Sequence, residues 1–326
     1  MRGMLLRGKA KVGRITANSR QPARGGAPDR EQGFGIVPGP SGSGVGRAVI
    51  WQLTGAIARG FLVMTLVILP ALLVPGVGAD TRQIVVLFGL IAGALTLIEY
   101  SATYPSLVEF RYAPPFNRLR FLAIALTVLA LATILRGQFA PTSLSLILQG
   151  IGAAVGQSLD FPYSPLRLLL LALPDTVTLE QVALVRSLAG ISLVICTLVL
   201  VVFLLTLRLA NWPAGQETFN VWVNLPTFDP TAGGDVVIRL ERDARFNIAI
   251  GLLLPFVIPA MAQLASGASA TLTLTGAQSL IWVVAAWAFL PASMLMRGVA
   301  MWRVARMIRD KRSELADTGA AAVATG

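Results

Sequence analysis

The sequence contains no histidine and only one cysteine, Cys196, in its 326 residues. Haem, zinc and iron–sulfur sites take histidine or several cysteines as ligands, so we expect no cofactor and no metal site. Acid–base or nucleophilic catalysis through histidine is excluded for the same reason. Cys196 lies in an apolar run, where a lone cysteine is expected to be a small buried residue.

Charge is also scarce. Only 13% of the residues are charged, against roughly 25% in soluble domains, whereas 55% are hydrophobic. Long apolar stretches of this kind are buried in lipid or in a helix bundle inside lipid. The glycine-rich phosphate loops, the GxSxG elbow and the HExxH motif are all missing from the sequence. The prediction is an all-α integral membrane protein that is not an enzyme.

The apolar stretches divide the chain into three parts. Residues 1–47 carry nine Lys and Arg with many Gly and Pro, which predicts a disordered basic cytoplasmic tail. Residues 48–296 are expected to form the membrane domain. Residues 297–326 are expected to form a basic amphipathic helix and a flexible tail. A crossing needs about 20 apolar residues, and six spans are predicted at residues 57–76, 84–104, 121–135, 187–207, 246–265 and 277–296.

The region 143–173 is predicted to re-enter the membrane from the periplasmic side without crossing it. Ser143–Leu159 is apolar, but the piece Leu166–Leu173 is too short to cross as a helix. If Ser143–Leu159 crossed alone, the chain would have seven spans and twelve of its 27 Lys and Arg would lie outside. Six spans leave outside only Arg82, Arg136, Arg167 and Arg186.

The positive-inside rule therefore favours six spans, with both termini in the cytoplasm of a bacterial inner membrane. A bias toward Arg, Ala, Gly, Leu and Val supports a bacterial source. An eight-crossing variant has the same parity and ranks second.

The connection between the fourth and fifth spans is predicted to hold a small cytoplasmic β-hairpin at residues 217–241. Phe219–Leu225 alternates between apolar and polar residues, as a half-buried strand does. The segment Thr227–Gly234 has turn chemistry, and Val236–Leu240 would be the second strand.

The helix after the last span is predicted to lie on an anionic membrane surface at the cytoplasmic face. No soluble domain here is large enough to bind nucleic acid, so lipid is the expected partner of this charge. The expected membrane-surface residues are Trp302, Arg303, Arg306, Arg309, Lys311 and Arg312.

A few polar residues in apolar segments are candidate sites. Arg59 and Glu99 are expected to lie near the cytoplasmic ends of neighbouring helices. Either an ion pair neutralises both, or the Arg59 side chain extends to the membrane interface without a partner. Gln149 and Gln157 share a helix face and precede Asp160. These three residues either line a polar cavity, with Asp160 as a cation or proton site, or serve ordinary helix packing.

Small residues and prolines mark two further helices. Gly89 and Gly93 form a GxxxG pattern, which predicts helix packing. Pro255 and Pro259 predict a bend that is either a transporter hinge or static.

The leading functional hypothesis is a non-enzymatic scaffold or assembly factor for a membrane complex, with a membrane-protein partner or a homo-oligomer. The alternative is a small-solute transporter or channel that uses 143–173 as its polar lining. A third hypothesis, a lipid-modifying enzyme with Asp160 and Asp175 as a carboxylate pair, has no support from spacing.

Overall fold

The computed structural model describes residues 42–103, 106–174, 176–213, 224–226, 228, 233–267 and 276–324. All secondary structure in these residues is helical, and residues 46–326 form one compact unit. Six helices are long and apolar enough to cross a membrane, which confirms the predicted all-helical membrane bundle. They are α1 (Gly42–Leu73), α2 (Ala79–Ser101), α3 (Phe116–Gly137), α6 (Leu179–Leu209), α8 (Val236–Gly267) and α9 (Ala277–Ala324).

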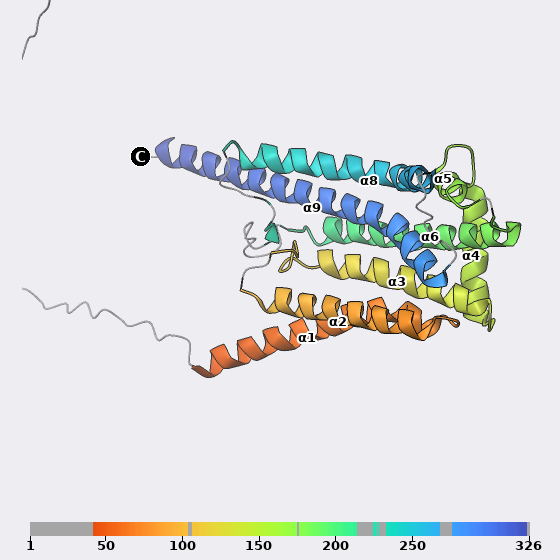
Figure 1. Ribbon diagram of the computed structural model, residues 1–326. Helices are drawn as coiled ribbons and strands as arrows, with labels where there is room; N and C mark the ends of the chain where they lie inside the picture. The colour runs from red at the N-terminus through yellow and green to blue at the C-terminus, as the bar shows by residue number, and fades with distance from the viewer. Residues whose placement is uncertain are drawn as a thin grey trace, which may run out of the picture. The chain divides into compact units, whose positions relative to one another are not determined.

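The six long helices run side by side in alternating directions (Figure 1). One end of the bundle holds the α2–α3 connection, the end of α6 and the start of α8, and we call it the Arg297 end. The opposite end holds two shorter helices, α4 (Ser143–Leu159) and α5 (Pro165–Leu171), and we call it the Asp160 end. Helix α1 begins and helix α9 finishes at the Arg297 end, as an even number of passes requires.

Two hydrophobic clusters fill the bundle. The cluster toward the Asp160 end includes Leu188 and Trp287, both fully buried. The cluster toward the Arg297 end includes Phe110, Phe116 and Phe203, whose rings lie 4.4 Å (Phe110–Phe116) and 5.9 Å (Phe116–Phe203) apart. Large apolar side chains on the outer faces of α1, α2 and α8 are exposed, as is expected of helices that face lipid.

Glycines bring α1 and α2 into close contact. A Cβ atom on Gly60 would lie 2.7 Å from the Gly93 carbonyl oxygen, and one on Gly89 would lie 2.6 Å from Ile68 Cγ1. The GxxxG pattern of α2 therefore serves helix packing, as predicted.

The predicted re-entrant hairpin at 143–173 is not supported. Helix α4 crosses the long helices at the Asp160 end instead of running antiparallel to α5 (Figure 1). Its glycines explain this placement, because a Cβ on Gly152 would lie 2.2 Å from the Ser187 carbonyl oxygen, and one on Gly190 of α6 would lie 2.1 Å from the Gly152 carbonyl oxygen. The backbones of α4 and α6 are thus in contact, which a larger residue would prevent.

The predicted β-hairpin at 217–241 is wrong where the structure describes it. Val236–Leu240, the expected second strand, is the first turn of α8, and no strand occurs among the described residues. The Asp235 carboxylate accepts a hydrogen bond from the Val237 amide (2.9 Å), and its carbonyl oxygen accepts one from Arg239 (3.1 Å). Asp235 therefore caps a helix. The first expected strand falls largely on residues 219–223, outside the described residues.

The prolines of α8 are tied to α9. Pro259 has no amide hydrogen, so the carbonyl oxygen of Pro255 has no partner within its own helix. The indole nitrogen of buried Trp287 donates to that oxygen at 3.0 Å. The contact satisfies both groups and favours a static bend over a hinge.

Candidate functional site

The α2–α3 connection is built around the carboxylate of Glu99. Its oxygens accept hydrogen bonds from the amides of Ser106 (2.6 Å), Leu107 (2.7 Å) and Val108 (3.0 Å), and from the Ser106 hydroxyl (2.9 Å). Glu99 is buried, and these donors replace the cation that was predicted for it. Arg59, the predicted partner, forms no ion pair with Glu99 in the structure: its guanidinium lies 4.8 Å from the ring centroid of Tyr100.

Arg111 holds the same loop through hydrogen bonds to main-chain groups. Its guanidinium donates to the carbonyl oxygens of Glu99 and Ala102 and contacts the Tyr112 hydroxyl. Arg111 is buried, so the loop keeps two charged side chains out of water, each held by main-chain groups.

A buried ion pair joins this loop to α9 and α8. The Arg297 Nε and Nη2 atoms donate to the two carboxylate oxygens of Glu109, at 2.6 and 2.8 Å. The Arg297 Nη1 atom donates to Asn247 Oδ1 of α8 at 2.7 Å, and Asn247 Nδ2 in turn donates to the Asp243 carbonyl oxygen at 2.7 Å. Glu109 and Asn247 are only 7% and 4% exposed. A bidentate ion pair of this kind stabilises the contact and also holds the two side chains in one relative orientation.

The segment before α8 is attached to the same loop. The Phe110 amide donates to the Asn224 carbonyl oxygen (2.6 Å), and the Tyr112 amide donates to Asn224 Oδ1 (3.2 Å). Buried Phe110 packs near Trp212, with ring centroids 5.9 Å apart. The Arg297 end is therefore one connected polar and aromatic structure.

The basic segment 297–315 continues α9 and is not a separate helix. Ion pairs join it to α8: Arg309 contacts Glu241, and Arg312 Nη1 lies 2.8 Å from Asp235 Oδ1. Arg303 Nη2 donates to the Leu207 carbonyl oxygen near the end of α6 at 3.0 Å. Several of the predicted membrane-surface arginines thus hold helices together.

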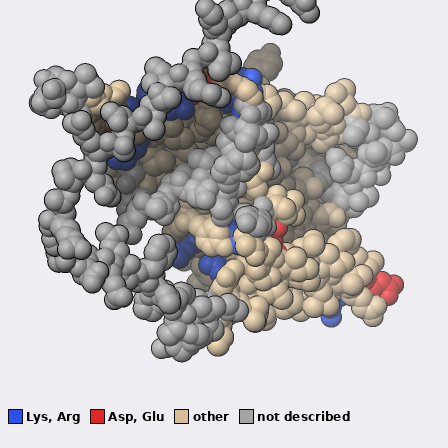
Figure 2. Space-filling view, turned by 90° about the vertical axis from the view of Figure 1, so that its left-hand side faces the viewer, with Lys and Arg blue, Asp and Glu red and all other residues tan. Residues whose placement is uncertain are grey.

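The remaining predicted membrane-surface residues are exposed. Trp302 is 44% exposed, and the Arg306 guanidinium lies 5.9 Å from its ring centroid. Lys311 pairs with Glu314 of its own helix at 2.9 Å. Figure 2 looks onto the Arg297 end, where Lys and Arg side chains are visible at more places than Asp and Glu.

Asp235 lies just outside the apolar span of α8. Hydrogen bonds to its carboxylate from the Val237 amide and from the Arg312 side chain hold the pKa of Asp235 below its ordinary value. The group is fully ionised at neutral pH and so supports both the start of α8 and its contact with α9.

At the Asp160 end, the three predicted polar residues do not share one cavity. The Asp160 carboxylate lies between Arg167 (3.1 Å) and Arg186 (2.9 Å), and those two ion pairs satisfy it. Gln149 accepts a hydrogen bond from Gln138, the residue directly after α3, at 3.2 Å. Gln157 is exposed, and its side chain makes no hydrogen bond to the described residues.

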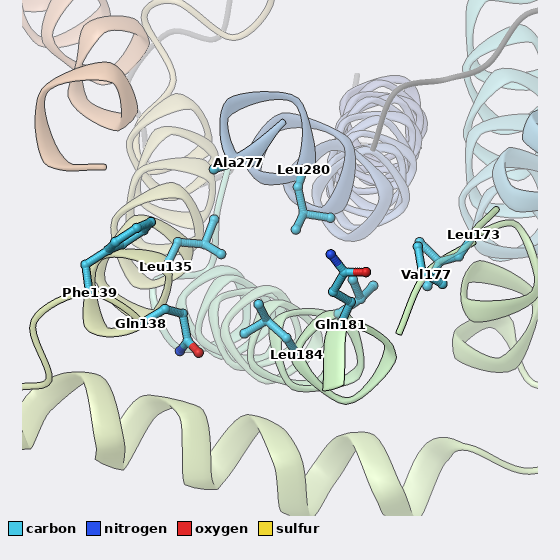
Figure 3. A pocket seen from close by; sticks show the side chains of 10 residues that line it. Leu135, Gln138, Phe139, Leu173, Val177, Gln181, Leu184, Ala277 and Leu280 are labelled. Carbon is cyan, nitrogen blue, oxygen red and sulfur yellow. The ribbon is translucent and has the colours of Figure 1, made fainter. Parts of the chain in front are cut away.

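A separate cavity of about 310 Å³ opens at this end among α3, α6 and α9 (Figure 3). Its two polar side chains are Gln138 and Gln181, and the Gln181 amide oxygen already accepts a bond from the Thr178 amide (3.0 Å). The lining residues are Leu135, Gln138, Phe139, Leu173, Val177, Gln181, Leu184, Val185, Ala277 and Leu280.

No group of three or more Cys, Asp or Glu side chains suited to a metal ion occurs in the described parts of the chain. Cys196 is buried, and its sulfur lies 3.6 Å from the Thr127 hydroxyl.

Comparisons with protein-family models, with curated proteins and with solved structures found no match for this chain. The connection Glu109–Arg297–Asn247 was not predicted from the sequence. Its signal was present, because Asn247 and Arg297 are polar residues at the borders of apolar spans.

Proposed function

We propose that this protein is a non-enzymatic, multi-pass scaffold or assembly factor whose Arg297 end binds a partner in a membrane complex. The observation that carries the proposal is the network of Glu109, Arg297 and Asn247. It joins the α2–α3 loop, α8 and α9 into one unit.

The buried charges of this network favour a structural role. A proton or ion site needs a titratable group that water or substrate can reach, whereas Glu109 and Glu99 have their oxygens occupied by protein donors. Fixing a loop before a partner arrives lowers the entropy cost of binding. Leu107 and Tyr112 are 75% and 51% exposed on this fixed loop, so both side chains are accessible to a partner.

We also propose that the Arg297 end, with both termini, faces the cytoplasm of a bacterial inner membrane. The Asp160 end carries Arg82, Arg136, Arg167 and Arg186, and two of these share the single negative charge of Asp160. The Arg297 end carries many more basic residues, which supports this orientation under the positive-inside rule.

Site-specific photo-crosslinking of the full chain in its native membrane tests the scaffold proposal. A photoreactive residue at Leu107 or Trp302 should give a discrete adduct of defined mass with a membrane protein. The same residue at Leu144 or Tyr163, 58% and 87% exposed at the Asp160 end, is the matched control. Adducts only at the control positions, or at none, would contradict the proposal.

The transporter alternative rests on the cavity of about 310 Å³ at the Asp160 end. Flux of small solutes into proteoliposomes, with Leu280→Trp to fill the cavity, tests it directly. Flux that is present in the wild type and lost in Leu280→Trp would replace the scaffold proposal. Asp160→Asn is a less specific test, because Asp160 is held by two arginines and does not line the cavity.

A further inference from the structure

A second basic feature lies away from α9, on the flank of the bundle. A cleft of about 160 Å³ opens between α1, α2 and the start of α3. Its polar lining includes Arg59, Tyr100, Asn117 and Arg118, one or two from each helix. One of them contacts the Glu109–Arg297–Asn247 network, because the Asn117 Nδ2 atom donates to the Glu109 carbonyl oxygen at 2.7 Å.

The two arginines of the cleft have no acidic partner in the described part of the chain. Arg59 donates only to the Gly55 carbonyl oxygen (2.7 Å) and lies over the Tyr100 ring. Arg118 is exposed and forms no ion pair there. The nearest carboxylate in sequence to Tyr100 is Glu99, which is occupied by the amides of the α2–α3 loop. The cleft therefore presents uncompensated positive charge.

Along α1 and α3, the residues that line the cleft change from polar to apolar toward the interior of the bundle. Leu62 lies about one turn deeper in the bundle than Arg59 on α1, and Phe121 lies about one turn deeper than Arg118 on α3. On α2, Thr96 lies about one turn deeper than Tyr100.

Thr96 fits the apolar side of this gradient, because its hydroxyl donates to the Ala92 carbonyl oxygen at 2.8 Å. The neighbouring Phe61 is 59% exposed on the outer surface of α1, so the apolar part of the cleft adjoins a surface that faces lipid.

We propose that this cleft binds one anionic phospholipid from the bilayer, with its phosphate between Arg59 and Arg118. Tyr100 provides a neutral hydrogen-bonding group at the same level, and the first acyl carbons contact Leu62 and Phe121. Guanidinium groups are well suited to phosphate oxygens. The apolar half of the cleft favours a lipid over a soluble phosphate, and the lack of a free carboxylate disfavours a zwitterionic headgroup.

Native mass spectrometry of the full chain in detergent tests this proposal. The protein is titrated with phosphatidylglycerol and, separately, with phosphatidylcholine of the same acyl chains. The wild type should bind phosphatidylglycerol more tightly, and the double variant Arg59→Gln, Arg118→Gln should lose about tenfold or more of that affinity. Arg208→Gln, which removes an exposed arginine at the end of α6 outside the cleft, should change the affinity little.

Three results would overturn the proposal. The first is equal affinity for the two lipids. The second is an equal loss in Arg208→Gln, which would indicate diffuse attraction. The third is displacement of the lipid by inorganic phosphate at a concentration similar to that of the lipid, which would indicate a site for a soluble anion.

A charge-preserving variant separates binding from folding. Arg59→Lys with Arg118→Lys should keep the preference for phosphatidylglycerol. If this variant has the wild-type melting temperature but loses the preference as fully as the Gln variant, the arginines act through packing and the proposal fails.

Discussion

The two ends of the bundle stabilise a largely buried carboxylate in different ways. Each holds a carboxylate whose side chain is 9% exposed, Glu109 at one end and Asp160 at the other, and each carboxylate contacts arginine. The partners of Asp160 are 7 and 26 residues away in the chain, whereas Arg297 is 188 residues from Glu109.

This difference in chain separation indicates what holds each end together. The Arg297 end has, beside its hydrophobic cluster, a long-range ion pair that joins the α2–α3 loop to α9. The Asp160 end depends on backbone contact between α4 and α6, and its ion pairs are an addition to that contact. Four substitutions test this comparison, in order of decreasing expected effect.

Glu109→Gln should destabilise the protein most. The change leaves the Arg297 guanidinium, 27% exposed, without its counter-charge, and losing one partner of a buried pair costs about 3–5 kcal/mol. The free energy of unfolding, measured by denaturant titration in mixed micelles, is the readout. Asp310→Asn breaks an exposed ion pair with Arg306 and should cost less than about 0.5 kcal/mol. Equal losses in the two variants would show that the Arg297 end does not depend on its buried pair.

Gly152→Ala should have the next largest effect. The new methyl group would lie 2.2 Å from the Ser187 carbonyl oxygen, so α4 must move away from α6 at a cost of about 1–3 kcal/mol. Gly150→Ala is the matched control on the same helix, because beyond its own helical turn no atom lies within 4 Å of its Cβ position. The same unfolding measurement applies, and a Gly150→Ala loss as large as that of Gly152→Ala would refute the backbone-contact explanation.

Asp160→Asn should cost less, about 1 kcal/mol. Arg167 is 48% exposed and stays solvated once the carboxylate charge is gone, and the backbone contact between α4 and α6 does not depend on that charge. A loss as large as that of Glu109→Gln would show that the two ends depend equally on their ion pairs.

Asp235→Asn should have the smallest effect, and one that depends on pH. The folded-state pKa of Asp235 lies below its unfolded value, so the stabilisation is fully present above about pH 4 and is lost as the pH falls through the folded pKa. The difference in melting temperature between the wild type and Asp235→Asn should therefore be constant from neutral pH down to about pH 5 and should shrink in more acidic buffer. A difference that stays the same down to pH 3 would assign the effect to the shape of the cap and not to its charge.

The membrane fold was predictable from the sequence because each span is a long apolar run. Such a run is buried in lipid or in a helix bundle inside lipid. The second strand of the β-hairpin was predicted wrongly because Val236–Leu240 is too short to show a helical period. The deciding signal was Asp235, a capping residue directly before it. The placement of α4 was not predictable, since 17 residues are too few for a clear span and hydropathy carries no information about direction.

The polar contacts were harder to predict than the fold. Arg59 and Glu99 were paired on the basis of equal depth, but Glu99 found donors in the loop that directly follows it. Glu109 and Arg297 lie far apart in the chain, and only the packing of α9 against the α2–α3 loop brings them together. The hydropathy pattern of a single sequence predicts how deep a residue lies in the membrane. It does not predict which residues at that depth contact one another.

The hydrogen bond from Trp287 to the Pro255 carbonyl oxygen has a mechanical consequence for α8 and α9. If either helix slid along the other by one turn, the indole hydrogen and the carbonyl oxygen would both be left without a partner in an apolar interior. Together with the pairing of Arg309 and Glu241 near the other end, this bond sets the two helices in a single register. Helices α8 and α9 should therefore move together as one rigid body, so that a displacement at the Arg297 end also displaces the Asp160 end.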